Sequence, residues 1–219
     1  MRDRVAVLEQ LGAAHRHLPL RPDPHERHQQ VRAGGFDQRP ACGAQVADRG
    51  FTALTVEGVA ARSGVHKTTV YRRWGNVAGL IADALELAGG EPWPVPDTGT
   101  IEGDLRALAR LVADGFADPR EGPVSTAFVS AAMHDADAAR ALHAFFMARH
   151  DQSSAIVTRA VARGELSADV DPAEVVRAAV APVYYRLFVS HEPVDAAVAD
   201  RAAGGALAAA RAGALNASV

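Results

Sequence analysis

Cysteine is almost absent from this chain, because Cys42 is the only one among 219 residues. A single thiol excludes an intramolecular disulfide and any Cys-rich zinc module, and we interpret Cys42 as an incidental thiol rather than a redox sensor. Long apolar runs are also missing, since no stretch of about 18 uninterrupted apolar residues occurs. We therefore predict no transmembrane helix and no membrane partner.

A secretory signal is missing as well. The first residues, "MRDRVAVLEQLGAAHRH", contain neither a long apolar stretch nor a convincing cleavage site. The sequence therefore leads us to expect a cytoplasmic protein.

Patterns typical of catalytic sites are the third absence. The chain has no paired carboxylates, no Ser-His-Asp order with a nucleophile elbow, no glycine-rich phosphate loop and no HExxH-type spacing. The nearest approach to a catalytic cluster is His134 with Asp135 and Asp137, and helix capping is the commoner role of such aspartates. Four early histidines suggest a metal site, but no regular helix is predicted there to fix their geometry. They are His15, His17, His25 and His28. We predict that the protein is not an enzyme and uses no cofactor or metal.

Lysine is rare too, because Lys67 is the only lysine among 23 basic residues. This preference for arginine is typical of a GC-rich bacterial genome. Residues 1–90 carry 12 bases and 9 acids, whereas residues 91–219 carry 11 bases and 17 acids. The asymmetry indicates that the front of the chain faces nucleic acid and that the back half meets something else.

What the sequence does contain is helical periodicity from Phe51 onward, without strand-like alternation. The fold class is therefore all-α. The strongest helix start is Asp171, an N-cap followed by Pro172 at the first helical position. Helices are predicted over 55–63, 65–74, 76–90, 101–116, 122–135, 137–163, 171–189 and 194–213.

Proline marks a boundary within this helical pattern. The stretch "EPWPVPDTG" holds three prolines in five residues, and no helix continues through it. We predict an atypical segment at 1–45, a three-helix unit at 46–90, a proline-rich linker at 91–100 and a larger helical domain at 101–219.

The most informative stretch is "GVHKTTVYRRW", which runs from Gly64 to Trp74. A short helix, a turn containing Gly64 and a second helix with hydroxyls and bases on its outer side make the arrangement of a major-groove reader. The first residues of the second helix would approach base edges, and flanking groups would hold phosphates. The candidate base-reading residues are His66, Lys67, Thr68 and Thr69, and the candidate phosphate-binding residues are Thr55, Tyr71 and Arg72, with Arg73 beside them.

Residues 49–85, "RGFTALTVEGVAARSGVHKTTVYRRWGNVAGLIADAL", resemble the DNA-binding domain of the TetR family of bacterial transcriptional regulators. The "GF" pair, the "LTVEGVAARSGV" helix and turn, and "TTVYRRW" stand in the family's order. The later stretch "DVDPAEVVRAAVAPVYYRLFVSHEPVD" is similar to the C-terminal ligand-binding and dimerisation domain of one branch. The resemblance implies a homodimer on a palindromic double-stranded DNA operator, most often a repressor, which an unknown small-molecule effector releases.

Two features depart from the family pattern. Its members usually carry a phosphate-gripping lysine where this chain has Gly75, Asn76 and Val77, which implies a weaker hold on the operator. The family also begins with a long amphipathic helix, and only residues 46–51 resemble its end. Either residues 1–45 are a genuine divergent arm, or they are translated in a shifted frame, since off-frame GC-rich codons yield Arg, His, Pro, Gly and Ala.

The back domain holds candidates for a ligand pocket, although plain core packing is the alternative for each of them. They are Phe116, Phe128, Met133, Phe145, Phe146, His150, Tyr184 and Phe188. The Ala-rich last helix, with Gly204 and Gly205, allows close approach of another helix, and we expect the last two helices to form the homodimer interface. Two other functions stay open. One is a small all-α enzyme in which the helical hairpin of residues 55–74 is only structural, and the other is a nonspecific DNA-binding protein.

Overall fold

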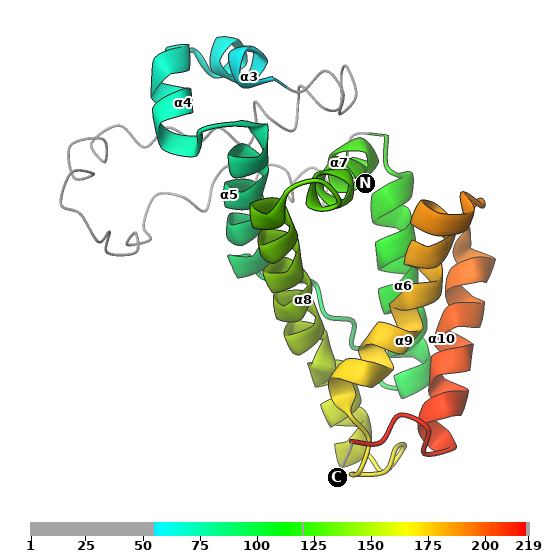
Figure 1. Cartoon of the computed structure of the whole chain (residues 1–219). Coiled ribbons are helices and arrows are strands. Elements are labelled where there is room, and N and C mark those ends of the chain that lie inside the picture. Colours follow the sequence, from blue (N-terminus) through cyan, green and yellow to red (C-terminus); the bar gives the residue numbers. More distant parts are fainter. Residues whose placement is uncertain (1–54, 120, 218–219) are drawn as a thin grey trace, which may run out of the picture.

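The structure is a computed structural model that describes residues 55–119 and 121–217 (Figure 1). The predictions for residues 1–45, including Cys42 and the early histidines, lie outside the described residues. The same holds for residues 46–51, which resemble the end of the family's leading helix.

The described residues fold into helices without a strand, apart from a single antiparallel bridge between Val170 and Asn216. The prediction of an all-α chain, with a three-helix helix-turn-helix unit followed by a larger helical domain, is confirmed. The elements are α3 (Val56–Ser63), α4 (Lys67–Trp74), α5 (Val77–Gly90), α6 (Ile101–Ala117), α7 (Glu121–Ala132), α8 (Ala136–Ala162), α9 (Pro172–Tyr185), the π-helical turn η4 (Arg186–Ser190) and α10 (Ala196–Arg211). No helix in the described ranges combines the length and the apolar character of a membrane span.

Side-chain caps fix where several of these helices begin. Asp171 accepts hydrogen bonds from the backbone N–H groups of Ala173 and Glu174, and Pro172 occupies the first turn, as predicted. Asp135 caps α8 in the same way, so its predicted capping role is confirmed. Each cap satisfies backbone donors that the first turn of a helix leaves without an intrahelical partner.

Helix α5 ends at Gly90, as predicted, and Glu91 is its C-cap. The position of Met133 departs from the sequence reading. Met133, a candidate for the ligand pocket with core packing as the alternative, is 77% exposed. It follows the end of α7, in the turn that leads to α8, so it is not part of the helix whose apolar side is buried.

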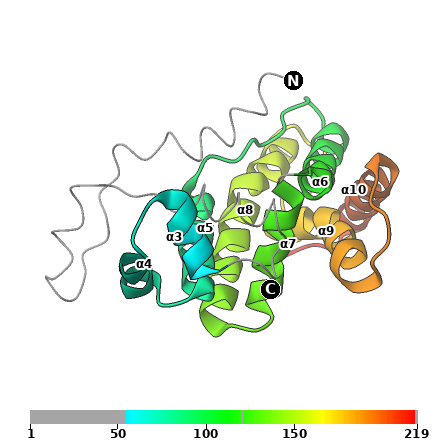
Figure 2. The same ribbon diagram turned by 90° about the horizontal axis from the view of Figure 1, so that it is seen from above.

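Two apolar cores divide the molecule. The front core joins α3, α4 and α5 to α7 and the beginning of α8, and it includes Val59, Val70, Leu85 and Ala138. The back core joins α6, α9 and α10 to the second half of α8. Because α8 belongs to both cores, it runs beside α5 at one end and beside α9 at the other (Figure 1). Seen from above, α4 and α10 stand at opposite edges of the described molecule (Figure 2).

The proline-rich segment at 91–100 is bound to the helices beside it. The N–H of Trp93 donates to Oε1 of Gln152 at 3.0 Å, and Arg159 donates to the carbonyl oxygen of Pro96. At its end, the Thr98 hydroxyl donates to Oδ1 of the fully buried Asp104 at 2.8 Å. The segment therefore holds α5 in a fixed relation to α6 and α8.

Leu105→Ala is expected to destabilise the fold by about 2–5 kcal/mol, because Leu105 is fully buried in the back core and alanine leaves a cavity there. The matched control is Met133→Ala, which removes a side chain that is largely in solvent and should change stability by less than about 0.5 kcal/mol. Urea unfolding measures both. Equal losses would show that Met133 is covered in solution.

Candidate functional site

The turn between α3 and α4 depends on a glycine. Gly64 has φ of 70°, in the left-handed region where a Cβ is strained, and its N–H donates to the carbonyl oxygen of Ala60. Thr55 caps the other end of α3 by accepting from the N–H of Gly58 at 3.0 Å. The turn at Gly64 lies where the sequence predicts it, and the turn and the cap together fix the two short helices of the reading head, residues 55–74.

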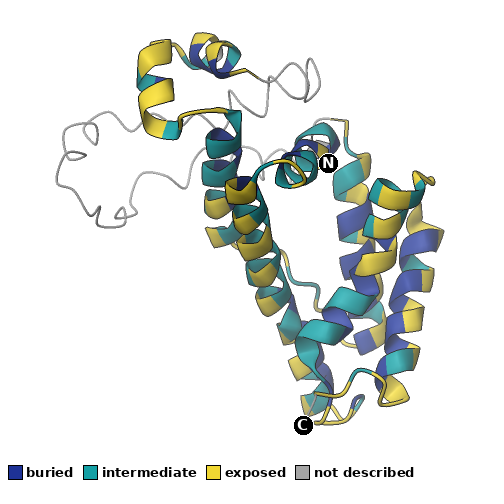
Figure 3. Ribbon diagram, viewed as in Figure 1, coloured by how far each residue is buried: buried dark blue, intermediate teal, exposed yellow. Residues whose placement is uncertain are grey.

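The inner side of α4 is anchored and its outer side is exposed. Val70 is fully buried in the front core, and Trp74 packs against the same core. The guanidinium of Arg73 lies 4.7 Å from the centre of the Trp74 ring, so Arg73 packs along the end of the helix. Most of α4 is open to solvent (Figure 3). The exposed candidates are Thr55, His66, Lys67, Thr68, Tyr71, Arg72 and Arg73, and Thr69 is half-buried.

His66 has a structural duty besides the predicted one. It is the N-cap of α4, and its Nδ1 accepts a hydrogen bond from the N–H of Thr68 at 3.4 Å. One ring nitrogen of His66 is therefore engaged with the backbone. Apart from Thr55, which caps α3, the rest of the candidate set extends along α4, with Thr68 and Arg72 on the side opposite Val70.

Glu57 is a residue of this surface that sequence reasoning missed. The hydroxyl of Tyr71 donates to Oε1 of Glu57 at 2.9 Å, which ties α4 to α3 across the turn. Hydrogen bonds from its own backbone N–H and from Tyr71 lower the pKa of Glu57, and the bond to Glu57 raises the pKa of Tyr71. The only sequence signal for this contact is an acid in the first turn of α3, which is common in any helix.

The electrostatic character of the reading head is positive despite Glu57. Between Thr55 and Ala82 the sequence has four bases and one acid. Three of the bases, Lys67, Arg72 and Arg73, lie on α4, which contains no acid. A short helix that presents hydroxyls and cations in this way can contact base edges and phosphates of a duplex.

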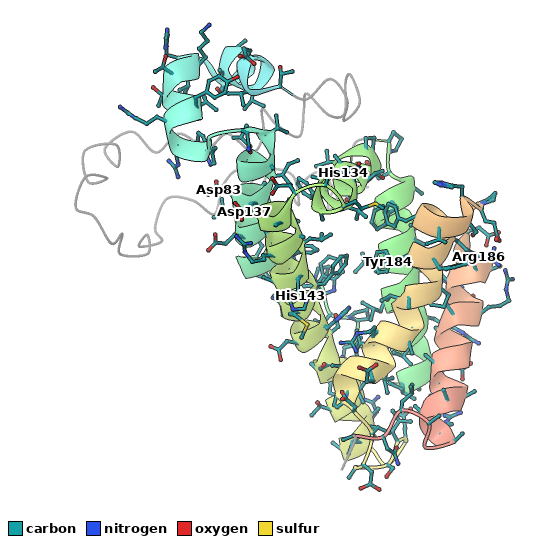
Figure 4. The ribbon with its side chains drawn as sticks, in the orientation of Figure 1. Asp83, His134, Asp137, His143, Tyr184 and Arg186 are labelled. Atoms are coloured by element: carbon teal, nitrogen blue, oxygen red, sulfur yellow. The ribbon has the colours of Figure 1, made fainter. Side chains whose placement is uncertain are left out.

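A second site is an apolar cavity of about 300 Å³ that opens to solvent between α8 and α9, with a contribution from α7. Figure 4 labels Tyr184 of α9, whose ring lies on the side of α9 that faces α8. The lining residues are Val129, Leu142, Phe146, His150, Arg177, Val180, Tyr184 and Phe188. Sequence reasoning missed Val129, Leu142, Arg177 and Val180, because apolar residues at core spacing and a helical arginine carry no signal of a cavity.

The cavity gathers four of the eight pocket candidates, namely Phe146, His150, Tyr184 and Phe188. Phe116 lies behind it, in edge contact with Tyr184 and Phe188 at centroid distances of 5.7 and 5.3 Å. Phe128 and Phe145 pack against the front core. Met133 is on the surface and does not line the cavity, so its assignment to the pocket is corrected.

Burial shapes the charge state of the cavity wall. It raises the pKa of the Tyr184 phenol above its usual value of 10, so this group stays protonated. Burial, together with the charge of Arg177, lowers the pKa of His150, and Glu174 opposes this shift. Arg177 itself forms an ion pair with Glu174.

A shallow groove lies between α9 and α10. Its volume is about 330 Å³, and small residues form much of its lining. These are Ala178, Ala202, Gly205, Ala206 and Ala209, with Pro182, Val198, Arg186 and Arg201 completing it. A Cβ added at Gly205 would meet no atom within 4 Å, so the groove is open to an approaching helix.

Comparison with known families and proteins gives two matches that cover most of the chain. The model of bacterial regulatory proteins of the tetR family matches residues 44–84, and the model of the tetracyclin repressor-like C-terminal domain matches residues 95–206. The HTH-type transcriptional regulator AqdR of Rhodococcus erythropolis is 30% identical over 181 residues, 80% of this chain and 84% of that protein. The HTH-type transcriptional regulator YdeS of Bacillus subtilis is 29% identical over 176 residues, 80% of this chain and 85% of its own.

Solved structures agree with these matches. The crystal structure of the TetR family transcription regulator SCO0332 superposes with a TM-score of 0.60 at 30% identity and covers 78% of this chain and 97% of its own. GusR of Salmonella enterica shares the fold at 18% identity, with a TM-score of 0.57 and coverage of 79% and 93%.

His150→Gln is expected to flatten the pH dependence of stability. The pKa of folded His150 lies below its ordinary value of 6.5, whereas the unfolded chain titrates near that value, so protonation favours the unfolded chain. The native protein therefore loses the stability that neutral His150 contributes as the pH falls through 6.5. Glutamine does not titrate, so the variant should not show this loss. Urea unfolding of both proteins between about pH 8 and pH 5 measures the difference. Parallel curves would contradict the assignment.

Proposed function

The chain belongs to the TetR family of bacterial regulatory proteins, and on this premise we propose that it represses transcription by binding a palindromic operator as a homodimer. A small molecule in the cavity between α8 and α9 would release it. A regulator of bacterial DNA acts in the cytoplasm, which agrees with the expectation from the sequence.

The exposed side of α4 is the observation that carries this proposal. Val70 anchors the helix, and Lys67, Thr68, Tyr71 and Arg72 are exposed to solvent, with Thr68 and Arg72 on the side opposite Val70. Buried anchoring fixes the orientation of the helix, so that its polar side chains would meet the groove in a defined register. The first turn would then read bases, while Tyr71 and Arg72 would contact phosphates.

The dimer follows from what a palindrome requires. Two reading heads must be held with their recognition helices about 34–36 Å apart, and a contact outside the heads must hold them. The groove between α9 and α10 supports this role because its small residues allow a helix of a second copy to approach closely. Helix α10, which forms one wall of the groove, stands at the edge of the described molecule opposite α4 (Figure 2).

Release by a ligand would use the packed helices α8 and α5, which connect the cavity to the reading head. The cavity is lined from α8, and α8 packs along α5, which carries the reading head. A ligand that prefers a different position of α8 would shift α5 and change the distance between the two heads. Ligand and operator would then weaken each other's binding by the same factor.

Selection of bound DNA from a random pool by the full chain tests the proposal. We expect recovery of an inverted repeat whose half-sites are centred about 10–10.5 base pairs apart, or a multiple of this spacing. Recovery of sequences without a shared motif would favour nonspecific binding. Failure of a folded dimer to bind any duplex would contradict the proposal.

The recovered operator allows a matched pair of variants. Lys67→Ala should weaken operator binding and also relax base preference by about 1–3 kcal/mol, because Lys67 lies in the first turn of α4. Tyr71→Phe removes only a hydroxyl and should weaken binding to operator and random DNA by a similar factor. Titration of both duplexes at several salt concentrations separates the two effects. If Lys67→Ala lost no discrimination, the base-reading role of Lys67 would be wrong.

Gly205→Leu is expected to convert the dimer to a monomer. The added side chain would fill the groove between α9 and α10, although each chain alone has room for it. Gly204→Leu is the matched control, since Gly204 is exposed, has no atom within 4 Å of an added Cβ and does not line the groove. Sedimentation equilibrium of both variants gives the assembly state. If the Gly205→Leu protein remained a dimer, the dimer interface would have to lie on another surface.

A further inference from the structure

The cavity wall presents aromatic rings in two orientations. The rings of Tyr184 and Phe188 are nearly parallel, with an interplanar angle of 14° and centroids 6.4 Å apart. Phe146 meets Tyr184 edge-on, at 77° and 5.4 Å. Faces and edges of this kind suit a flat aromatic guest, which can stack on one ring and meet another at its edge. The volume of about 300 Å³ is at the small end of the range for ligand sites, which fits a molecule of about two fused rings.

Two polar groups at this cavity have no hydrogen-bond partner among the described residues. The hydroxyl of Tyr184 forms no hydrogen bond there, and burial is the only influence on its ionisation. Nδ1 of His150 is buried without a partner. Buried polar atoms are paired in most proteins, so the orphaned Nδ1 of His150 marks the position of a polar atom of the guest. The Tyr184 hydroxyl on the same wall is not one of the buried unpaired atoms, but it is a donor without a partner among the described residues and is available to a guest.

The charges around the cavity cancel. Arg177 is the one permanently charged residue in the lining, and Glu174 on the same helix neutralises it. An anionic guest would have to compete with Glu174 for Arg177 and would leave water for an otherwise apolar wall. The Tyr184 hydroxyl offers a proton, so the complementary atom of the guest is an acceptor.

We propose that the cavity binds an uncharged, flat aromatic molecule that carries one carbonyl-type acceptor, which receives the hydrogen bond of the Tyr184 hydroxyl. This inference rests on the proposed function only for its role in regulation, because binding of the guest to the cavity does not require DNA. Phe146 and Phe188 hold the rings of the guest, and His150 lies beside its polar end.

Three probes of nearly equal size test the proposal with the full chain in the absence of DNA. 2-Acetylnaphthalene has the rings and the acceptor, 2-ethylnaphthalene lacks the acceptor, and 2-naphthoate adds a charge. Isothermal titration should show that 2-acetylnaphthalene binds about fivefold more tightly than 2-ethylnaphthalene, as expected for one net hydrogen bond of about 1 kcal/mol. It should also bind more tightly than 2-naphthoate.

The variant Tyr184→Phe assigns the hydrogen bond. It keeps the ring and should bring the affinities of the acetyl and ethyl probes within about twofold of each other, since only the acceptor contact is lost. Tyr185→Phe is the matched control, because the neighbouring Tyr185 is 57% exposed and does not line the cavity. It should preserve the preference for the acetyl probe.

Several outcomes would overturn the inference. These are equal binding of the acetyl and ethyl probes to the native chain, tightest binding of 2-naphthoate, and no binding of any probe by a folded chain. If the Tyr184→Phe protein still preferred the acetyl probe to the ethyl probe, Tyr184 would not be the hydrogen-bond donor. Loss of operator binding by the native chain would contradict the proposed function but would leave the probe affinities unaffected, so the two failures are distinguishable.

Discussion

The reading head depends on the front core, which includes residues of α5 as well as its own. Helices α3 and α4 have eight residues each, which is too short for either to be stable in isolation. Val59 and Val70 are fully buried only because α5, through Leu80 and Ile81, completes the front core around them. The orientation of α4 is therefore set by α5, and any displacement of α5 would move the reading head with it.

Arg149 connects that constraint to the back domain. From α8 it donates to the carbonyl oxygens of Ala88 and Glu91 at 2.5 and 2.8 Å, where α5 ends, and its guanidinium lies 4.7 Å from the centre of the Trp93 ring. Burial lowers the pKa of Arg149, and Glu91 opposes the shift. The next residue, His150, lines the cavity. Rotation or translation of α8 around a ligand would thus act directly on the end of α5, with no longer pathway required.

Much of this arrangement is predictable from sequence, because it depends on local patterns. Thr55, Gly64 and Asp171 act through their own turn or helix end, and apolar spacing identifies Val70 as the anchor of α4. Contacts between distant segments escape such reasoning. Glu57 is an ordinary first-turn acid until the folded chain brings Tyr71 to it. Among eight pocket candidates, the sequence could not separate Phe146, which lines the cavity, from Phe145, which packs on the front core, because adjacent residues differ only in which neighbouring helix they face.

On the proposed function, the exposed side of α4 would balance affinity for DNA against selectivity. The family usually has a phosphate-binding lysine near the position of Asn76. In this chain Asn76 instead caps α5, because its side chain accepts a hydrogen bond from the N–H of Gly79 at 2.9 Å. Glu57 adds a negative charge next to Tyr71. Both features would reduce the sequence-independent attraction to phosphates, which supplies most nonspecific binding. Contacts made by the first turn of α4 to base edges are short-range and would be reduced less. The surface would therefore give up total affinity for DNA while keeping a larger ratio between the operator and other sequences.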